Sequence, residues 1–171
     1  MNKYSKITLV AIIAIIIPFV YSILNIYAAE QLQFRWGEQN RFNYFELSNN
    51  GDVKFCNTLP YWTSFKKFEI TTFYDLRNKG TFTMQPLVIN PLSSAVQNGV
   101  FLSEGLNEAQ YLFMQLDYEF NGGEIRLDPN KMYIVVSIDT PIIGVIPYST
   151  TMQYSGFDFN KIMNGENFNC E

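Results

Sequence analysis

The chain has 171 residues, of which 47% are apolar and 16% aromatic, with 12 basic and 16 acidic side chains and no histidine. Without histidine there can be no Ser-His-Asp or Cys-His nucleophile system, no His-ligated zinc or copper site, and no imidazole acid or base working near neutral pH. The sequence also lacks a Gly-rich phosphate loop, a dinucleotide fingerprint and a CxxC motif. We therefore expect no cofactor, no bound metal and no enzymatic activity.

A long uncharged segment follows the first six residues. Positions 7–29 carry no charge and are mostly Ile, Val, Leu, Phe and Ala, and as a helix they would reach about 34 Å, enough to cross a bilayer. We predict a retained signal-anchor helix over 7–29 that contacts membrane lipid. A cleaved secretory signal, cut after Ser22, is the alternative, but the apolar run is longer than such signals need and no A-x-A-like site follows it.

The charges that flank this helix predict its orientation. Lys3 and Lys6 precede it, so the positive-inside rule leaves residues 1–6 in the cytoplasm and residues 30–171 outside the cell membrane. These two residues account for 2 of the 12 basic side chains, which leaves 10 basic and 16 acidic groups in the outer part, a net charge of −6. Such a surface does not favour nucleic acid as a partner.

The outer part divides into a polar juxtamembrane tether over 30–41 and one domain over 42–171. Short alternating or aromatic-rich runs, separated by Gly, Pro, Asn and Asp, predict β-strands. The expected strands are Phe42–Ser48, Val53–Cys56, Phe65–Tyr74, Thr81–Ile89, Val100–Leu102, Ala109–Phe120, Glu124–Leu127, Lys131–Ile138, Gly144–Tyr148 and Met152–Phe157.

Two details of this pattern matter for the fold. Asn50-Gly51, between the first two runs, is typical of a hairpin turn. Ser103–Met114 could form a helix, but its second half is aromatic-rich and we predict a strand there. With no helical crossovers between strands, the fold class we expect is all-β, an immunoglobulin- or fibronectin-like antiparallel β-sandwich preceded by one transmembrane helix.

The chain has two cysteines, Cys56 and Cys170. Outside the cell an even pair favours a disulfide, which here would close a loop of about 114 residues and tie down the C-terminal tail. The alternative is two unrelated thiols, one on a strand and one at the terminus.

Two further groups of side chains are candidate sites. Asp117 and Glu119 would share one face of a strand, as in a paired-carboxylate hydrolase, although residues at this spacing are more often simply solvated. Tyr61 and Trp62 follow a proline in an expected loop and are candidate interface residues; the alternative is that Trp62 closes one end of the sandwich core.

Two stretches carry a resemblance: FRWGEQNRFNYFELSNNGDVKFCN (Phe34–Asn57) and DPNKMYIVVSIDTPIIGVIPYSTTMQYSGFDF (Asp128–Phe159). They resemble an uncharacterised family of small membrane-anchored archaeal proteins, and the resemblance covers most of the chain. The segment TPIIGVIP is also similar to the late-embryogenesis-abundant type of fibronectin-like sandwich. Both resemblances imply the fold class, and neither implies catalytic residues.

These observations predict a membrane-anchored extracytoplasmic domain that binds a protein partner, as an accessory component of an envelope or membrane complex. A pilin-like structural subunit is the alternative, although Lys6-Ile7 does not match the usual archaeal prepilin cleavage junction. A carboxylate-based envelope hydrolase, built on Asp117 and Glu119, is the third interpretation.

Overall fold

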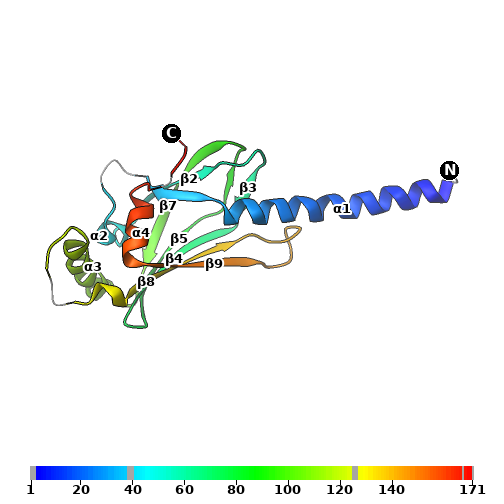
Figure 1. Ribbon diagram of the computed structural model, residues 1–171. Helices are drawn as coiled ribbons and strands as arrows, with labels where there is room; N and C mark the ends of the chain where they lie inside the picture. Colours follow the sequence, from blue (N-terminus) through cyan, green and yellow to red (C-terminus); the bar gives the residue numbers. More distant parts are fainter. Residues whose placement is uncertain (1–2, 38–40, 125–126, 167, 171) are drawn as a thin grey trace.

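One long helix projects from a β-rich domain in the computed structural model, which describes residues 3–37, 41–124, 127–166 and 168–170 (Figure 1). Helix α1 spans Lys3–Glu30. Its segment Tyr4–Glu30 has a mean hydropathy of 2.8 in its most apolar window, of which only 6% is buried by the rest of the chain. It is long and apolar enough to span a membrane, and it includes the predicted anchor over 7–29.

The described strands form a seven-stranded antiparallel sheet in the order β1-β2-β7-β5-β4-β8-β9 and a two-stranded sheet, β3-β6. The strands are β1 Gln33–Trp36, β2 Gly51–Asn57, β3 Thr63–Phe65, β4 Lys67–Tyr74, β5 Arg77–Met84, β6 Leu87–Ile89, β7 Ser93–Leu102, β8 Met132–Asp139 and β9 Ser149–Ser155. Burial alternates along β4 and β8, so one face of the large sheet carries the core, with Ile70 and Val136 fully buried.

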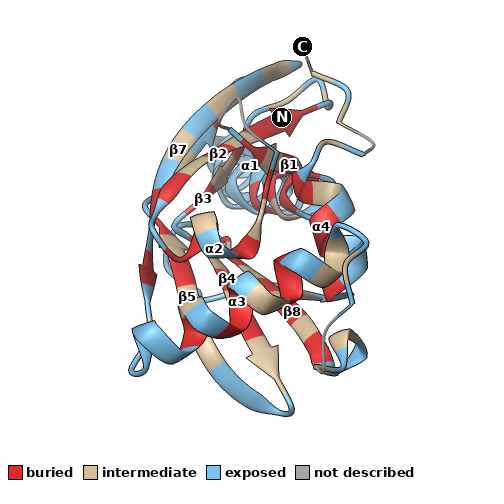
Figure 2. Cartoon of the chain, turned by 90° about the vertical axis from the view of Figure 1, so that its left-hand side faces the viewer, coloured by how far each residue is buried: buried red, intermediate tan, exposed pale blue. Residues whose placement is uncertain are grey.

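Three helices cover this apolar face: α2 Tyr44–Leu47, α3 Leu106–Phe120 and α4 Gly156–Met163. Figure 2 shows buried positions on all three, in front of the buried positions of the sheet. Their rings complete the core, as where Phe159 of α4 packs 6.3 Å from Phe34 of β1. The antiparallel β architecture is confirmed, but the expected sandwich is not: in the described residues the large sheet packs against helices where a sandwich would have a second large sheet.

The predicted hairpin at Asn50-Gly51 is wrong. Residues 44–47 form α2 instead of a strand, because the side chain of Asn43 accepts a hydrogen bond from the N–H of Glu46 and so caps a helical turn. Asn50 does adopt the positive φ expected of a turn residue, at 71°. The turn joins α2 to β2, which pairs with β1 and β7.

The predicted strand over Ala109–Phe120 is also wrong, since these residues lie in α3. Ala109, Leu112, Phe113 and Leu116 are buried at the i, i+3, i+4, i+7 spacing of one helical face. Their packing against the sheet outweighs the weak strand propensity of the aromatic residues.

Other boundaries differ from expectation. The predicted tether contains β1, an edge strand paired with β2, and α1 runs to Glu30, so the domain begins almost directly at the helix end. Gly144–Tyr148 is no strand; an isolated bridge between Ile142 and Ile146 lies there. Residues 1–2 of the expected cytoplasmic segment, 38–40 of the tether and 125–126 of the expected strand Glu124–Leu127 lie outside the described residues.

Candidate functional site

The most specific polar contacts between distant segments lie where α1 meets the domain, and we call this region the junction. Asn25 is buried on α1, where its Nδ2 donates to the carbonyl of Ser64 at 3.0 Å. Its Oδ1 accepts from the N–H of Ser64 at 2.6 Å. One side chain therefore pairs with β3 much as a neighbouring strand would.

Ser22 makes the second contact of the junction, one helical turn earlier. Its Oγ donates to the Pro18 carbonyl at 2.9 Å and accepts from the N–H of Ile143 at 2.8 Å. The first bond is the back-bond that a serine side chain in a helix makes to the carbonyl one turn earlier. The second holds the loop between β8 and β9 against α1, 121 residues away in the sequence.

A cavity of about 590 Å³ lies at the junction. It is bounded by α1, by β3 and β6, and by the β8–β9 loop, and its lining includes Pro18, Phe65, Val88 and Ile143. Its lining is mostly apolar. Among the described residues Lys66 is the one charged residue that lines it, and the Lys66 ammonium donates to the Gly144 carbonyl at 3.0 Å.

The two cysteines predicted to pair lie together. Cys56 and Cys170 form a disulfide with a Cα–Cα distance of 5.6 Å. Cys56 lies on β2 opposite Gln33 of β1, so the bond ties the C-terminal tail to the strand pair that follows α1. Its role is structural.

Tyr61 and Trp62 lie just before β3, as the loop prediction implied. The Trp62 side chain is 51% exposed, so it does not close the end of the core. Its indole N–H donates to the Asn90 side chain at 3.2 Å. About half of Trp62 is therefore open to the surroundings.

Asp117 and Glu119 do not form the expected carboxylate pair. They lie on a helix, where residues two apart point about 200° from one another. Asp117 is buried, and its two oxygens accept the N–H groups of Tyr44 and Phe45 at 2.8 and 2.9 Å. Asp117 therefore holds α2 against α3.

Burial also changes the ionisation of this group and its neighbour. Desolvation raises the pKa of Asp117 to about 6, and the charge of Glu46 adds to the rise, while the hydrogen bonds from Tyr44 and Phe45 oppose it. Desolvation, followed by the negative charge of Asp117, raises the pKa of Tyr44 well above its usual value. The Tyr44 hydroxyl donates to the Gly156 carbonyl at 2.7 Å and so links α2 to α4.

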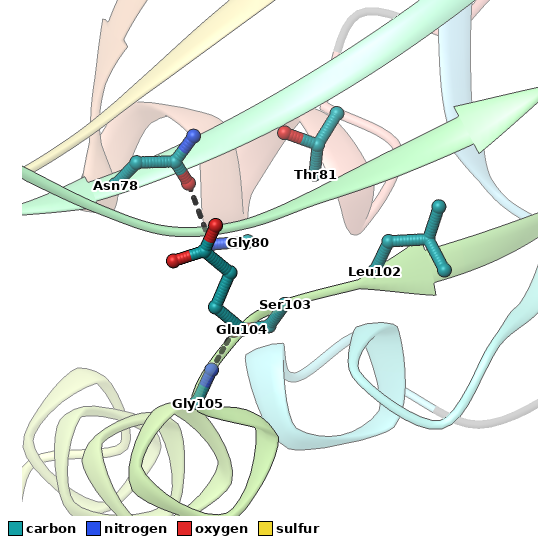
Figure 3. A pocket seen from close by; sticks show the side chains of 7 residues that line it. All are labelled: Asn78, Gly80, Thr81, Leu102, Ser103, Glu104 and Gly105. Atoms are coloured by element: carbon teal, nitrogen blue, oxygen red, sulfur yellow. Dashed lines mark hydrogen bonds between the residues drawn. The ribbon is translucent and has the colours of Figure 1, made fainter.

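A second hollow, of about 510 Å³, lies between β5 and the loop that leads into α3 (Figure 3). Its polar groups bond to one another: Asn78 accepts the Gly80 N–H at 2.8 Å, and Ser103 donates to the Lys79 carbonyl at 2.6 Å. Of the residues that the structure describes, Glu104 is the only ionisable one that lines it. In the described part of the chain, no three Cys, Asp or Glu side chains gather as they would to hold a metal ion.

The sequence interpretation missed Ser22 and Asn25. Both are polar residues inside an otherwise apolar helix, and their spacing of three puts them on one face. That pattern is the available signal, because a polar side chain in a membrane helix usually has a partner. It could not have named Ser64 or Ile143 as the partners.

No protein-family model matches the chain, and no curated protein matches it either. Among solved structures, a protein from Archaeoglobus fulgidus is 12% identical over 72% of this chain and 94% of its own length, with a TM-score of 0.32. A TM-score this low does not establish a shared fold. We draw nothing from this likeness about the family or the function of the chain.

Proposed function

We propose that this chain is a non-enzymatic, single-pass protein of the cell membrane whose extracytoplasmic β-domain binds a protein partner, as an accessory component of an envelope or membrane complex. Helix α1 crosses the membrane, with the N-terminus in the cytoplasm. The exposure of α1 supports this, because Val10, Ile13 and Ile17 are 66%, 46% and 61% exposed and would be costly in water.

The junction carries the proposal. Asn25 and Ser22 are hydrogen-bonded to two separate segments of the domain, and α1 ends within three residues of β1. The domain therefore cannot reorient on a flexible linker. A domain held in one orientation above the membrane presents the same surface to a neighbour in that membrane, and confinement raises the effective concentration of such a partner.

The face of the large sheet away from the helices is the surface we assign to the partner. Val96, Val100 and Leu102 of β7 are 53%, 48% and 66% exposed there. Beside them is a hollow of about 490 Å³, whose lining includes the ion pair of Lys67 and Glu69 at 2.7 Å. Apolar residues bordered by polar groups are typical of protein interfaces.

Photo-crosslinking in intact cells tests this function. A photoreactive p-benzoylphenylalanine in place of Val100 should give one discrete protein adduct in the membrane fraction. The matched control places the same group at Leu76, which is exposed on a different edge of the domain. A monomer that gives no adduct from Val100, or the same adducts from both sites, would contradict the proposal.

The pilin-like alternative has one observation in its favour. A single apolar helix projects from a β-domain, an arrangement that pilin-like subunits also use (Figure 1). Electron microscopy of cells with and without the protein separates the two, since a filament subunit predicts filaments that disappear with the gene.

A further inference from the structure

The loop between β8 and β9 exposes an apolar tip. We call residues Ile142–Ile146 the β8–β9 tip. Ile143, Val145 and Ile146 are 37%, 82% and 49% exposed, and the sequence has no charged residue from Thr140 to Phe157. Water-exposed loops seldom combine consecutive exposed Ile and Val residues with a complete lack of charge.

The junction sets the position of this tip along α1. Ile143 bonds to Ser22, and Ile143 and Gly144 line the same cavity as Ile17 and Pro18. The tip therefore lies beside the turns of α1 that run from Ile17 to Ser22. Figure 1 shows the orange β8–β9 loop extending along α1 toward its N-terminal end.

The length of α1 places those turns inside a bilayer. A hydrocarbon core of about 30 Å needs about 20 helical residues, so a span that begins at Ile7, after Lys6, ends near Ile26. Ala28 and Ala29 are each 1% exposed because the domain covers them, whereas the sequence prediction extends the span to Ala29. Ser22 lies inside the span in either case, and the tip lies beside it.

Four of the five backbone N–H groups of the tip have a hydrogen-bond partner, which suits an apolar medium, where unpaired N–H groups are costly. The Ile142 N–H donates to the Ile146 carbonyl at 2.9 Å. The N–H groups of Val145 and Ile146 both donate to the Ile142 carbonyl, at 3.1 and 3.0 Å, and that of Ile143 donates to Ser22. Prolines at both sides of the tip, Pro141 and Pro147, have no N–H to satisfy.

One basic side chain, that of Lys66, reaches the tip, and the amphipathic Tyr148 lies at its base. Lys66 donates from its backbone to Asp139 and from its side chain to Gly144, and Tyr148 is 37% exposed just after Pro147. Lysine and tyrosine favour the boundary between hydrocarbon and headgroups, where the ammonium and the phenol stay hydrated. Both side chains are therefore of the kinds that suit a loop at a bilayer surface.

We propose that the β8–β9 tip inserts into the outer leaflet beside α1, so that lipid holds the domain at two places. This inference rests on the proposed membrane span of α1. The occupant is lipid, because Ser22 attaches the tip to the helix at a depth that lipid surrounds. The second contact prevents the domain from rotating about the single helix and so defines which face of the sheet a neighbour meets.

Photo-crosslinking of the full chain in vesicles of phosphatidylcholine and phosphatidylglycerol tests the inference. p-Benzoylphenylalanine replaces Val145, Leu76 or Ile12 in three separate variants, and intact mass reports covalent lipid. Val145 and Leu76 are matched, being 82% and 84% exposed apolar residues at hairpin tips. We expect lipid adducts from positions 145 and 12 at about tenfold the yield from position 76, which is in water.

Each other outcome has a separate meaning. Lipid adducts from position 12 but not from position 145 would overturn the inserted tip and leave the span of α1 intact. No lipid adduct from position 12 would overturn the span, and the inference with it. A crosslink from position 145 to a second copy of the chain, in place of lipid, would overturn the inference in favour of self-association.

Discussion

Two hairpin connections at opposite ends of the sheet differ sharply in chemistry. Strands β4 and β8 are neighbours, with Lys67 opposite Asp139 at one end and Tyr74 opposite Met132 at the other. β4 turns into β5 at the Tyr74 end, through Asp75 and Leu76, and β8 leads into the β8–β9 tip at the Asp139 end. We call these the distal end and the α1 end.

The backbone of the two turns is alike. Asp75 and Leu76 have φ values of 52° and 64°, and Ile143 and Gly144 have values of 52° and 73°, as in the tight turns that suit twisted hairpins. What differs is the charge within each loop. Asp75 lies 3.4 Å from the Lys131 ammonium, whereas the β8–β9 tip contains no acidic or basic residue and meets one from outside, the Lys66 ammonium on the Gly144 carbonyl. If the tip inserts as proposed, loop composition and not turn geometry distinguishes the end that meets lipid from the end that meets water.

The largest expected effect comes from the disulfide, which holds the C-terminal tail at β2, next to the strand that follows α1. Cys170→Ser should lower the free energy of unfolding by about 3–4 kcal/mol, because the bond closes a long loop in the unfolded chain. Urea unfolding in detergent micelles measures it. Reductant should lower the free energy of unfolding of the wild type by the same amount and leave that of the variant unchanged. If reductant does not destabilise the wild type, the loss in the variant does not come from the disulfide.

Asn25→Leu should detach α1 from β3. It should thereby weaken the attachment to α1 that distinguishes the α1 end of the domain from the distal end. The variant leaves the N–H and carbonyl of Ser64 unpaired in a part-buried site, which should cost about 2–4 kcal/mol. Hydrogen exchange should also rise in β3. Leu24→Ala, on the exposed side of the same turn, is the control, and equal losses in both variants would argue against the Asn25 bonds.

The raised pKa of Asp117 allows the contact between α2 and α3 to be tested by changing the pH. Because the folded state holds this proton more tightly than the unfolded chain, the stabilisation is complete below the usual pKa of 3.8 and is lost as the pH rises through about 6. Between about pH 4 and pH 7 the wild type should lose about 1–3 kcal/mol relative to Asp117→Asn, which cannot titrate there. Unfolding curves of both proteins across this range measure the difference. If the free energy of unfolding depends on pH in the same way in both, the pKa of Asp117 is not raised by burial.

The smallest effect is expected at the distal end. Leu76→Asp should change the free energy of unfolding by less than about 0.5 kcal/mol, since Leu76 is 84% exposed and surrounded by water. The value should be the same in detergent and in vesicles when measured by thermal unfolding. A loss of stability that appears only in vesicles would show that the distal end contacts lipid, and the two ends would then not differ in their surroundings.

The sequence alone determined features that depend on local composition. The uncharged run before the domain predicted α1, and alternating residues such as Ile134, Val136 and Ile138 predicted β8. Cys56 and Cys170 were expected to pair simply because they are the two cysteines of the chain. In each case the signal lies within one segment or in a count of residues.

Tertiary structure decided the rest, because the physical cause lies in another part of the chain. The aromatic residues of α3 favoured a strand when the sequence was considered alone. They lie in a helix because the sheet offers a surface that buries one helical face. Asp117 became a buried cap instead of half of a carboxylate pair because α2 packs onto it. Ser22 and Asn25 gained their roles only when Ile143 and Ser64 approached α1, since a hydrogen bond needs both partners and one segment of sequence contains only one of them.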